Sequence, residues 1–490
     1  MSSSSPTDVV SSLIPARMDR LPWAGFHWMV VAGLGVSWIL DGLEIQLVAS
    51  AGFQKTLGMS TQEVAFAGTV YLIGQVVGAL TFGRLTDSWG RKKLFIITLG
   101  IYLVGSGIAG LATSVWFLYL FRFVAGLGIG GEYTAINSAI DELIPARYRG
   151  RVDIAINGTY WAGAGLGAFA SLWLLDPAYV HEDWGWRIGF FIGPVMGLVI
   201  IWLRRHIPES PRWMLTHGQA QQAERIVEDT EASVRAQGIH LEPVPESRAM
   251  LVRAKEEVSL AQLAQVFFKD YPTRTILGIT MMVTQSFLYN AIFFTYALVL
   301  QNFYGTTPAS TQYYFFPFAI GNLLGPLLLG PLFDTLGRRK MIFLTYGLAG
   351  AVLAASAFLF QAGALTATTQ TLLWCIAFFF ASAAASAAYL TVSEIFPLEV
   401  RGQAISYFFA VAQVAGAIAP AIYGMLIGDG TQRTPLFYGY LVGAVIMITG
   451  GVVALVYGVD AEQKGLEDVA KPLSRVDDAQ PGPGARLAGG

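Results

Sequence analysis

An eleven-residue motif occurs twice in this chain of 490 residues. Residues 83–93 read GRLTDSWGRKK and residues 330–340 read GPLFDTLGRRK, so a glycine, an aspartate, a second glycine, an arginine and a lysine recur in the same order. A second set recurs in the same sense: Glu142, Pro145, Arg149 and Gly150 return as Glu394, Pro397, Arg401 and Gly402. The sequence therefore predicts two homologous halves that follow one another without inversion.

Long apolar segments fill both halves. Hydrophobic residues make up 54% of the chain and charged residues 13%, whereas soluble domains carry about 25% charged residues. A bilayer-spanning helix needs roughly 20 apolar residues. Twelve such runs, six per half, are expected at 25–50, 60–82, 94–112, 115–143, 152–175, 186–206, 272–303, 309–330, 340–360, 368–394, 402–426 and 434–457. The fold class predicted is an all-α membrane protein with two pseudo-symmetric six-helix bundles.

The predicted bundles divide the chain into five parts. A short N-terminal segment (1–24) precedes the first bundle (25–206), a polar central loop (207–271) leads to the second bundle (272–458), and a tail (459–490) follows. The tail is polar and rich in glycine and proline, so we expect it to be disordered. Two parallel repeats in a membrane are typical of transporters that bind their substrate between the halves.

Basic residues lie on one side of the predicted helices. The connections between even- and odd-numbered helices, together with the central loop, hold Arg91, Lys92, Lys93, Arg147, Arg149, Arg151, Arg204, Arg205, Arg338, Arg339, Lys340 and Arg401. The opposite connections are poor in lysine and arginine, and residues 176–183 carry acidic residues instead. The positive-inside rule then places both termini and the central loop in the cytoplasm. We expect a monomeric, multi-pass protein of the plasma membrane, namely a bacterial inner membrane.

Several function classes are not supported by the sequence. The single cysteine, Cys375, excludes an internal disulfide and a cysteine-based metal site. A net charge of −2 gives no indication of a nucleic-acid partner. We find no phosphate-binding loop, no His/Glu zinc arrangement and no nucleophile elbow, and the N-terminus lacks the pattern of a signal peptide. We therefore expect neither an enzyme nor a bound cofactor or metal.

The duplicated motif resembles the loop signature of the major facilitator superfamily, and the resemblance covers about residues 20–460. It implies a gate formed by Asp87 with Arg91 and by Asp334 with Arg338. In physical terms, Asp87 can accept hydrogen bonds from the N-terminal end of a neighbouring helix or from Arg91, and so latch the halves in one state. The alternative is that the arginines only fix the topology, but that leaves the aspartates and glycines unexplained.

Three further segments resemble the sugar-porter-like branch of that superfamily: PESPRWM at 208–214, RFVAGLGIGG at 122–131 and SEIFPLEVRG at 393–402. By this resemblance, a cytoplasmic ion-pair network would comprise Glu142, Arg149, Glu209, Arg212, Glu394 and Arg401. Such pairs would break and reform as the cavity changes sides. The alternative interpretation is a solvated charged rim.

Ionisable residues within the predicted helices indicate function, because they are costly in a membrane. Asp41 and Glu44 stand three residues apart, on one face of the first helix, and Arg122 lies on the fourth. A buried arginine needs a carboxylate, so Arg122 should pair with Glu44 or Asp41. Glu44 resembles the proton-accepting aspartate of sugar/proton symporters, and Asp41 with Glu44 resembles the Asp-Gly-x-Asp element of bacterial aromatic-acid and sialate symporters. The alternative is a static ion pair in a facilitator. Glu132 could line the pathway or support a packing contact.

Polar and aromatic side chains on apolar helices are the substrate-site candidates. They are Gln285, Asn290 and Phe294 on the seventh helix, Asn157, Tyr160 and Trp161 on the fifth, and Asn322, Tyr389 and Gln413 on later ones. The amides are favoured, because an unpaired amide in the membrane is costly; the aromatic rings could instead face lipid. Several positions differ from the hexose-binding pattern of sugar porters.

The sequence predicts a proton-coupled symporter that takes up a small organic acid by alternating access. A sugar or polyol symporter is the first alternative, and an efflux antiporter the second. Helix 5 is rich in glycine but lacks the proline usual in antiporters of the superfamily. A membrane-bound substrate sensor is the alternative outside transport.

Overall fold

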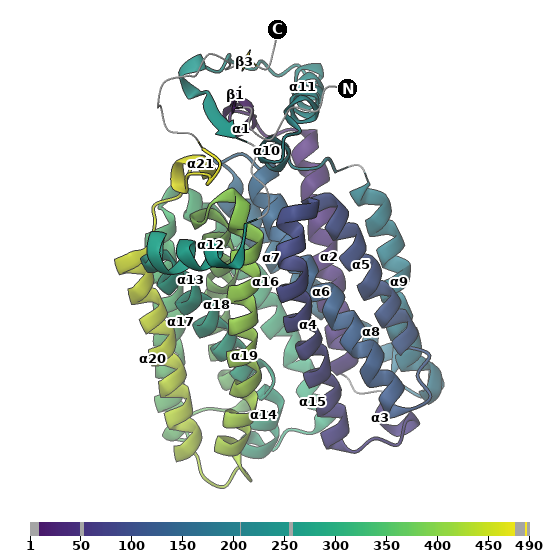
Figure 1. Cartoon of the computed structure of the whole chain (residues 1–490). Coiled ribbons are helices and arrows are strands. Elements are labelled where there is room, and N and C mark those ends of the chain that lie inside the picture. The colour runs from purple at the N-terminus through teal and green to yellow at the C-terminus, as the bar shows by residue number, and fades with distance from the viewer. Residues whose placement is uncertain (1–8, 50–52, 206, 254–257, 476–485, 488–490) are drawn as a thin grey trace.

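The computed structural model describes residues 9–49, 53–205, 207–253, 258–475 and 486–487. The two halves form two helical bundles that stand side by side (Figure 1). The end of the molecule that carries α1, α10, α11 and α21 also carries the first and last described strands (9–12 and 486–487), and we call it the terminal face. Because the halves follow one another without inversion, corresponding helices of both bundles run in the same direction.

The first bundle contains α2 (Gly25–Ala49), α4 (Thr61–Trp89), α5 (Arg91–Ala109), α6 (Val115–Leu143), α7 (Arg149–Gly158), α8 (Tyr160–Leu174) and α9 (Glu182–Arg204). The second contains α13 (Pro272–Phe293), α14 (Tyr296–Tyr304), α16 (Phe315–Thr335), α17 (Arg338–Gln361), α18 (Ala367–Ile395), α19 (Arg401–Ile427) and α20 (Thr434–Tyr457). Short helices α3 (Phe53–Thr56) and α15 (Pro308–Tyr313) lie in connections at the opposite end.

Eleven of the described helices are long and apolar enough to cross a membrane. The expected fifth span is the exception, because it is divided at Thr159 into α7 and α8. The Thr159 hydroxyl donates to the carbonyl of Ile156 at 2.6 Å and to that of Gly35 at 3.2 Å. Such a hydroxyl competes with the helix ladder and favours a break. The seventh span is likewise interrupted, between α13 and α14 at Phe294–Thr295.

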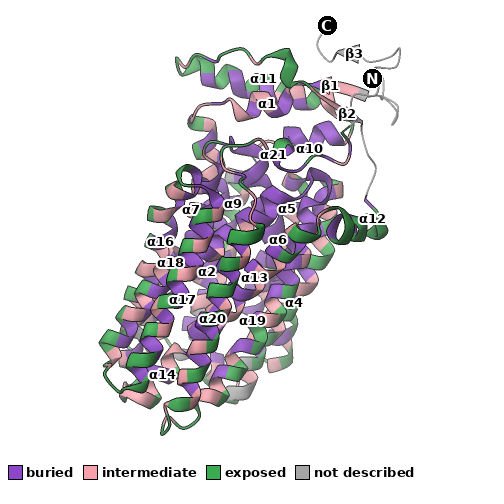
Figure 2. Cartoon of the chain, turned by 90° about the vertical axis from the view of Figure 1, so that its left-hand side faces the viewer, coloured by how far each residue is buried: buried purple, intermediate pink, exposed green. Residues whose placement is uncertain are grey.

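The outer faces of the bundles are apolar. Large hydrophobic side chains such as Trp116, Leu198 and Met425 are 79%, 68% and 75% exposed. Exposed residues follow the outer helices, whereas buried residues gather where the helices approach the terminal face (Figure 2). An apolar surface of this extent belongs against lipid, so the all-α membrane fold predicted from the sequence is confirmed.

Glycines allow helices α4 and α6 to approach closely. A side chain at Gly126 or Gly130 would collide with the backbone carbonyl of Tyr71 or Gln75, so small residues are needed at this contact. Two other glycines make the turns of the duplicated motif, where Gly90 and Gly337 have φ values of 95° and 104°. Only Gly90 separates α4 from α5, and only Leu336 and Gly337 separate α16 from α17. The basic residues of the motif therefore begin the following helices.

Smaller elements cover the terminal face. They are α1 (Ile14–Asp19), α10 (Pro211–Thr216), α11 (Ala220–Ala236), α12 (Leu260–Gln265), α21 (Leu466–Val469), β1 (Val9–Ser12), β2 (Met250–Arg253) and β3 (Arg486–Leu487), with short 3₁₀ or π segments at 246–248, 266–270 and 398–400. The strands form a sheet in the order β2-β1-β3. Glu231 of α11 accepts hydrogen bonds from Arg17 at 2.9 Å and Arg20 at 2.5 Å, so the central loop and the N-terminal segment fold together.

The prediction of a disordered tail is wrong for residues 459–475. This segment includes α21 and lies along the terminal face (Figure 1). Ser474 and Leu473 donate backbone hydrogen bonds to Glu399 at 2.9 and 3.0 Å, and Gln463 donates to the carbonyl of Asp334 at 2.9 Å. The polar composition of the tail led to the prediction of disorder, but its polar groups form hydrogen bonds with residues of the second bundle. Most of the remaining tail, at 476–485 and 488–490, lies outside the described residues.

Candidate functional site

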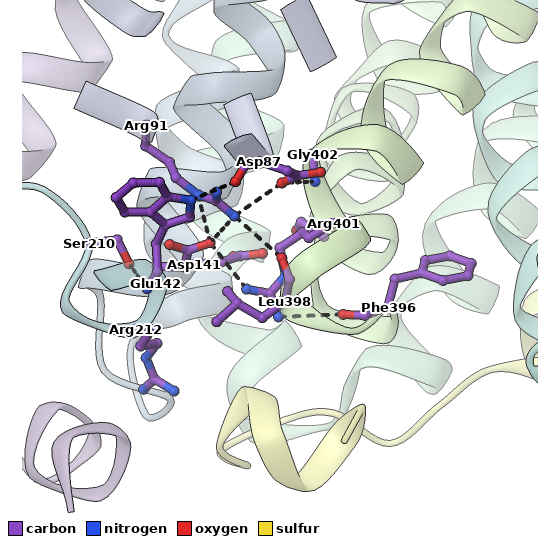
Figure 3. A network of polar contacts seen from close by, with 12 residues as sticks. Asp87, Arg91, Asp141, Glu142, Ser210, Arg212, Phe396, Leu398, Arg401 and Gly402 are labelled. Atoms are coloured by element: carbon purple, nitrogen blue, oxygen red, sulfur yellow. Dashed lines mark hydrogen bonds and ion pairs between the residues drawn. The ribbon is translucent and has the colours of Figure 1, made fainter. Parts of the chain in front are cut away.

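The two motif aspartates bind helix N-termini of the opposite bundle. The amides of Gly402 and Gln403, which begin α19, donate to the two carboxylate oxygens of Asp87 at 3.1 and 3.0 Å (Figure 3). Asp334 accepts in the same way from Gly150 and Arg151, at the start of α7, at 3.1 and 2.9 Å. The expected contact to a neighbouring helix is therefore present, in both copies and across the interface between bundles. The positive end of each helix dipole strengthens it.

Each motif arginine pairs with the aspartate of its own copy of the motif and with a glutamate of the same bundle. Arg91 lies 3.2 Å from Asp87 and donates to Glu142 at 2.8 Å. Arg338 lies 2.9 Å from Asp334 and forms two bonds to Glu394, at 2.9 and 3.0 Å. All of these side chains are buried. Buried charges require such complete pairing, because each unpaired ion would cost several kcal/mol, on the order of 3–5.

Three ion pairs cross between the bundles, the first of them between Arg151 and Asp334 at 3.0 Å. Arg401 lies 3.4 Å from Glu142 (Figure 3), and Arg149 lies 3.6 Å from Glu394. The predicted network of charges thus exists as a buried cluster rather than a solvated rim. Arg212 differs from the expectation in its partners, because it pairs with Glu467 of the tail and with Asp19 at 2.9 Å.

Glu209 acts as a helix cap. Its carboxylate accepts from the backbone amides of Arg91 and Lys92, both at 3.0 Å, at the start of α5. Burial raises the pKa of Glu209, while the amide of Ser210 and the charge of Arg91 oppose that rise. Glu462 of the tail caps α17 in the corresponding way, accepting from the amide of Arg338 at 3.3 Å. The sequence analysis missed Glu462; its position after the twelfth helix, as Glu209 follows the sixth, was the available signal.

The predicted ion pair of the first bundle is formed by Glu44 and Arg122, 3.4 Å apart and both buried. Tyr102 donates a second hydrogen bond to Glu44. Asp41 has a different environment, because its carboxyl group accepts from Tyr71 at 3.2 Å and from Tyr133. Among the described residues, Asp41 has no cation within 4 Å. Two neighbouring carboxyl groups are thus held by different partners, one by a guanidinium and one by tyrosines.

An aromatic cluster lies beside Asp41. The rings of Trp38 and Tyr133 stack at 4.5 Å with 10° between their planes. Tyr389 and Phe409 of the second bundle contact this pair edge-on, with Tyr389 6.2 Å from Trp38 and Phe409 5.4 Å from Tyr133. The cluster therefore spans both bundles. Of its members the sequence analysis selected only Tyr389; Trp38, one turn before Asp41 on α2, could have been found from that spacing.

Two polar groups near this cluster have no hydrogen-bond partner in the part of the chain that the structure describes. They are the indole nitrogen of Trp38 and the side-chain oxygen of Asn157, both buried. The Asn157 amide nitrogen donates to Asn137 at 3.2 Å and to the backbone of Asp153 at 2.8 Å, which fixes the orientation of the group. An unpaired donor and acceptor are costly in an apolar interior, and a bound ligand would satisfy them.

Trp161 is the centre of a second aromatic cluster. Its ring lies 5.6 Å from Tyr289, 5.5 Å from Phe293 and 5.6 Å from Phe318. Asn322 supports this cluster from behind, because its side-chain oxygen accepts from Tyr289 and its amide donates to Phe318 at 2.8 Å. Tyr160 precedes Trp161 and stands 5.5 Å from it. Trp161 of the predicted fifth helix thus meets the seventh and eighth helices.

The remaining candidates lie apart from one another. Gln413 of α19 donates to Gln75 of α4 at 2.7 Å, which joins the bundles. The Asn290 amide donates to the backbone of Ser286 at 2.7 Å, and the buried Gln285 makes no hydrogen bond among the described residues. Phe294 is 47% exposed at the break before α14 and contacts Phe293, at the edge of the second cluster.

Glu132 forms a second ion pair within the first bundle. Its carboxylate lies 2.7 Å from Arg204, and both side chains are buried. The guanidinium also donates to the carbonyl of Gly33 at 3.2 Å and to Ser37, and it lies 2.9 Å above the ring of Phe95. The assignment of Arg204 to the basic loop residues is therefore wrong, because α9 ends with its side chain turned into the bundle.

Known proteins provide an independent comparison. The chain is 26% identical over 460 residues to the niacin transporter NiaP of Acinetobacter baylyi, covering 93% of this chain and 99% of the relative. It is 29% identical over 181 residues to the sialic acid transporter NanX of Escherichia coli, covering 36% of this chain and 44% of the relative.

A solved structure gives the fold. The proton:xylose symporter XylE, of the major facilitator superfamily, superposes with a TM-score of 0.74 at 18% identity, covering 90% of this chain and 98% of that chain. The sequence profile of the family described as Sugar (and other) transporter matches residues 44–470. These matches identify a transporter rather than an enzyme. The chain is a membrane transporter with the major facilitator fold, and it belongs to the Sugar (and other) transporter family.

Proposed function

We propose that this protein is a proton-coupled symporter for a small organic acid that carries a flat ring. The observation that carries the proposal is Asp41, a buried carboxyl group held by two tyrosines beside the stacked rings of Trp38 and Tyr133. A proton-binding group and a platform for a ring therefore lie together where the two bundles meet.

The paired acids offer a physical basis for coupling. A buried carboxyl group without a cation favours its neutral form, whereas a nearby guanidinium favours the ionised form. Glu44 has Arg122 at 3.4 Å. A small movement of α2 relative to α6 would exchange that guanidinium between the two acids, and one proton would be bound or released. Substrate that stacks on Trp38 contacts the same turn of α2, so its binding and the proton state are linked.

The chemistry of the site favours an acid with a ring. Niacin is a pyridine carboxylate and sialic acids are ring carboxylates, and transporters of both are relatives of this chain. The aromatic cluster provides stacking surfaces, and the Trp38 indole supplies a hydrogen-bond donor for a carboxylate or ring atom. A sugar or polyol remains the second candidate, since the buried amide of Gln285 has no partner among the described residues and amides bind hydroxyl groups.

We also propose that the terminal face is the cytoplasmic side. The basic residues of the duplicated motif lie there, as the positive-inside rule requires. In this conformation, Asp87 and Asp334 join the bundles at that face. Opening the cavity to the cytoplasm would break both contacts, and this is the gating role that we assign to them together with the ion pairs behind them.

Proton movement in proteoliposomes tests the proposed function. Purified protein is reconstituted with a pH-sensitive dye inside, and nicotinate, benzoate, N-acetylneuraminate, xylose and myo-inositol are each added outside. We expect an acid with a ring to drive internal acidification, at a rate that saturates with its concentration. Protein-free liposomes control for passive diffusion of the neutral acid. If only xylose or inositol acidifies the lumen, the substrate assignment is wrong; if compounds cross without proton movement, the coupling is wrong.

Trp38→Phe tests the aromatic platform. Phenylalanine keeps a ring for stacking on Tyr133 but removes the unpaired indole nitrogen. We expect substrate affinity to fall by about tenfold, the effect of losing one hydrogen bond of roughly 1.4 kcal/mol. The apparent affinity for the driving acid is measured by saturation of the proton signal. Trp116→Phe, at an outward-facing position that is 79% exposed, is the matched control and should leave affinity unchanged.

A further inference from the structure

We propose that the proton leaves the first bundle through Glu132 and Arg204, by a side route that is separate from the substrate cavity. The proposal rests on the proton-coupled function above. It gives Glu132 and Arg204 a common role, whereas the sequence analysis left Glu132 between a pathway and a packing role.

Three carboxyl groups and two guanidinium groups are buried along one path in the first bundle. On α2, Ser37, Asp41 and Glu44 follow one another at intervals of four and three residues, so they share one helix face. Ser37 contacts Arg204, Asp41 accepts from Tyr133, and Glu44 pairs with Arg122. On this face of α2, Asp41 therefore lies between Ser37, which contacts the Arg204 pair, and Glu44, which belongs to the Arg122 pair.

The charges of this path do not balance. Asp41, Glu44 and Glu132 would carry three negative charges when ionised, against two positive charges on Arg122 and Arg204. A buried excess charge is strongly unfavourable. One of the three acids therefore holds a proton, and the two guanidinium groups determine which.

Glu132 has a free position for that proton. Only Oε1 of its carboxylate contacts Arg204, while Oε2 is buried without a hydrogen-bond partner among the described residues. The Nη1 atom of Arg204 is likewise buried and unpaired. The ionisable groups that face Glu132 are Arg204 from α9 and, at longer range, Asp41 from α2. Phe95 covers the guanidinium from α5.

A pocket lies beside the Arg204 side chain of this pair. We call it the side pocket; it offers about 20 Å³ of space to water, room for about one molecule, and its lining includes Leu34, Arg91, Lys92, Phe95, Ala139 and Arg204. Pro208 and Ser210, which also line the pocket, belong to the connection after α9. Every lining residue belongs to the first bundle or this connection, so the pocket does not cross the interface where we place the substrate.

The step that we assign is a simple proton transfer. The Asp41 carboxyl group gives its proton, through water, to the carboxylate of Glu132, and Asp41 becomes the anion. Arg204 then withdraws from the neutral Glu132 and Glu132 releases the proton to water in the side pocket, which restores the ion pair.

Replacing the whole pair separates a proton role from a structural one. Glu132→Leu with Arg204→Met exchanges a buried ion pair for apolar residues of similar volume, a change that proteins commonly tolerate. The proposal predicts that proton-driven accumulation and substrate-induced acidification slow by about a hundredfold, the lower end of what positioned proton transfer contributes. Substrate exchange between equal concentrations, which needs no net proton movement, should be retained. Glu132→Asp should restore part of the proton flux.

Access to the side pocket is tested separately. In a Cys375→Ala background, Ala139→Cys places a single thiol at the pocket wall, and a membrane-impermeant thiol reagent sealed inside the vesicles attaches a bulky group there. We expect proton release to slow while exchange continues. Protein that retains only the native Cys375, on α18 of the other bundle, is the labelling control.

The outcomes discriminate between the two proposals. If wild-type protein moves no protons with any substrate, both the proposed function and this route are wrong. If wild type is coupled and the double variant is equally coupled, the function stands and the Glu132–Arg204 route is overturned. Loss of exchange as well as coupling in a folded double variant would assign the pair to substrate transport itself and would also overturn the separate route.

Discussion

Glu44→Gln is expected to abolish accumulation of substrate against a gradient while leaving substrate exchange intact. Glutamine keeps the shape of the side chain and can still accept a hydrogen bond from Tyr102 and Arg122, which contact Glu44 in the structure. It cannot change its charge, so the proton gradient can no longer bias the transport cycle. Without that coupling free energy, the ratio of internal to external substrate should fall to about one.

Uptake into vesicles with an imposed pH gradient gives this ratio directly. Exchange is measured in the same preparation with equal concentrations of labelled and unlabelled substrate on both sides. Glu63→Gln is the matched control, because that glutamate caps the start of α4 on the opposite side of the membrane by accepting from Ser60 at 2.8 Å. Normal accumulation by Glu44→Gln would remove this residue from the coupling mechanism. Loss of exchange as well would indicate that Glu44 is needed for the conformational change.

Asp87→Ala combined with Asp334→Ala is expected to slow turnover with little change in substrate affinity. Each carboxylate accepts two backbone hydrogen bonds from a helix of the opposite bundle. Each such charged contact contributes about 1–3 kcal/mol, and it exists only while the terminal face is closed. Each substitution should therefore shift the equilibrium towards the state open at that face by about 5- to 150-fold, and return to the closed state becomes rare.

Single-turnover exchange measures the change in turnover, and the accessibility of a cysteine at the terminal face measures the shift towards the open state. We expect the exchange rate to fall for each single variant and further for the double variant, while the substrate concentration at half saturation stays within about threefold. Gly402→Cys is unsuitable as an accessibility probe, because a side chain at that position meets Asp87. Position 403 is buried in the closed state, so the thiol of Gln403→Cys should become reactive towards thiol reagents in the aspartate variants. Asp87→Asn keeps one acceptor and should be less impaired than Asp87→Ala. Unchanged turnover in the double variant would contradict the gating role.

The repeats made much of the ion-pair cluster between the bundles predictable from the sequence. Asp87, Arg91 and Glu142 occupy positions whose spacing is fixed by helices, and a second copy in the other half repeats them. A duplicated motif in parallel halves implies a pseudo-two-fold arrangement, so the partners of one copy indicate those of the other. The Glu44–Arg122 pair was predictable for a different reason: an arginine within the membrane requires an acidic partner, and the predicted helices contain few acidic residues.

The substrate site was less predictable. Trp38 and Phe409 are apolar residues in apolar helices, and composition cannot separate a ring that faces the interface from one that faces lipid. Asn322 satisfies its own hydrogen bonds within the second bundle, which its residue type could not reveal. The sequence analysis assigned Arg204 to the basic residues of the connections, because the end of α9 was predicted only to within several residues. In the structure its side chain pairs with Glu132.

The sequence by itself determined that this protein crosses a membrane, that its two halves are homologous, and which charged residues recur in both halves, because periodicity, hydrophobic length and repeated motifs are local properties of the chain. The tertiary structure alone decided which partner each charge has. It assigned Arg212 to the tail, left Asp41 without a cation, and brought Trp38 of one bundle against Tyr389 of the other. These contacts join residues far apart in the chain, and only the packing of helices fixes them.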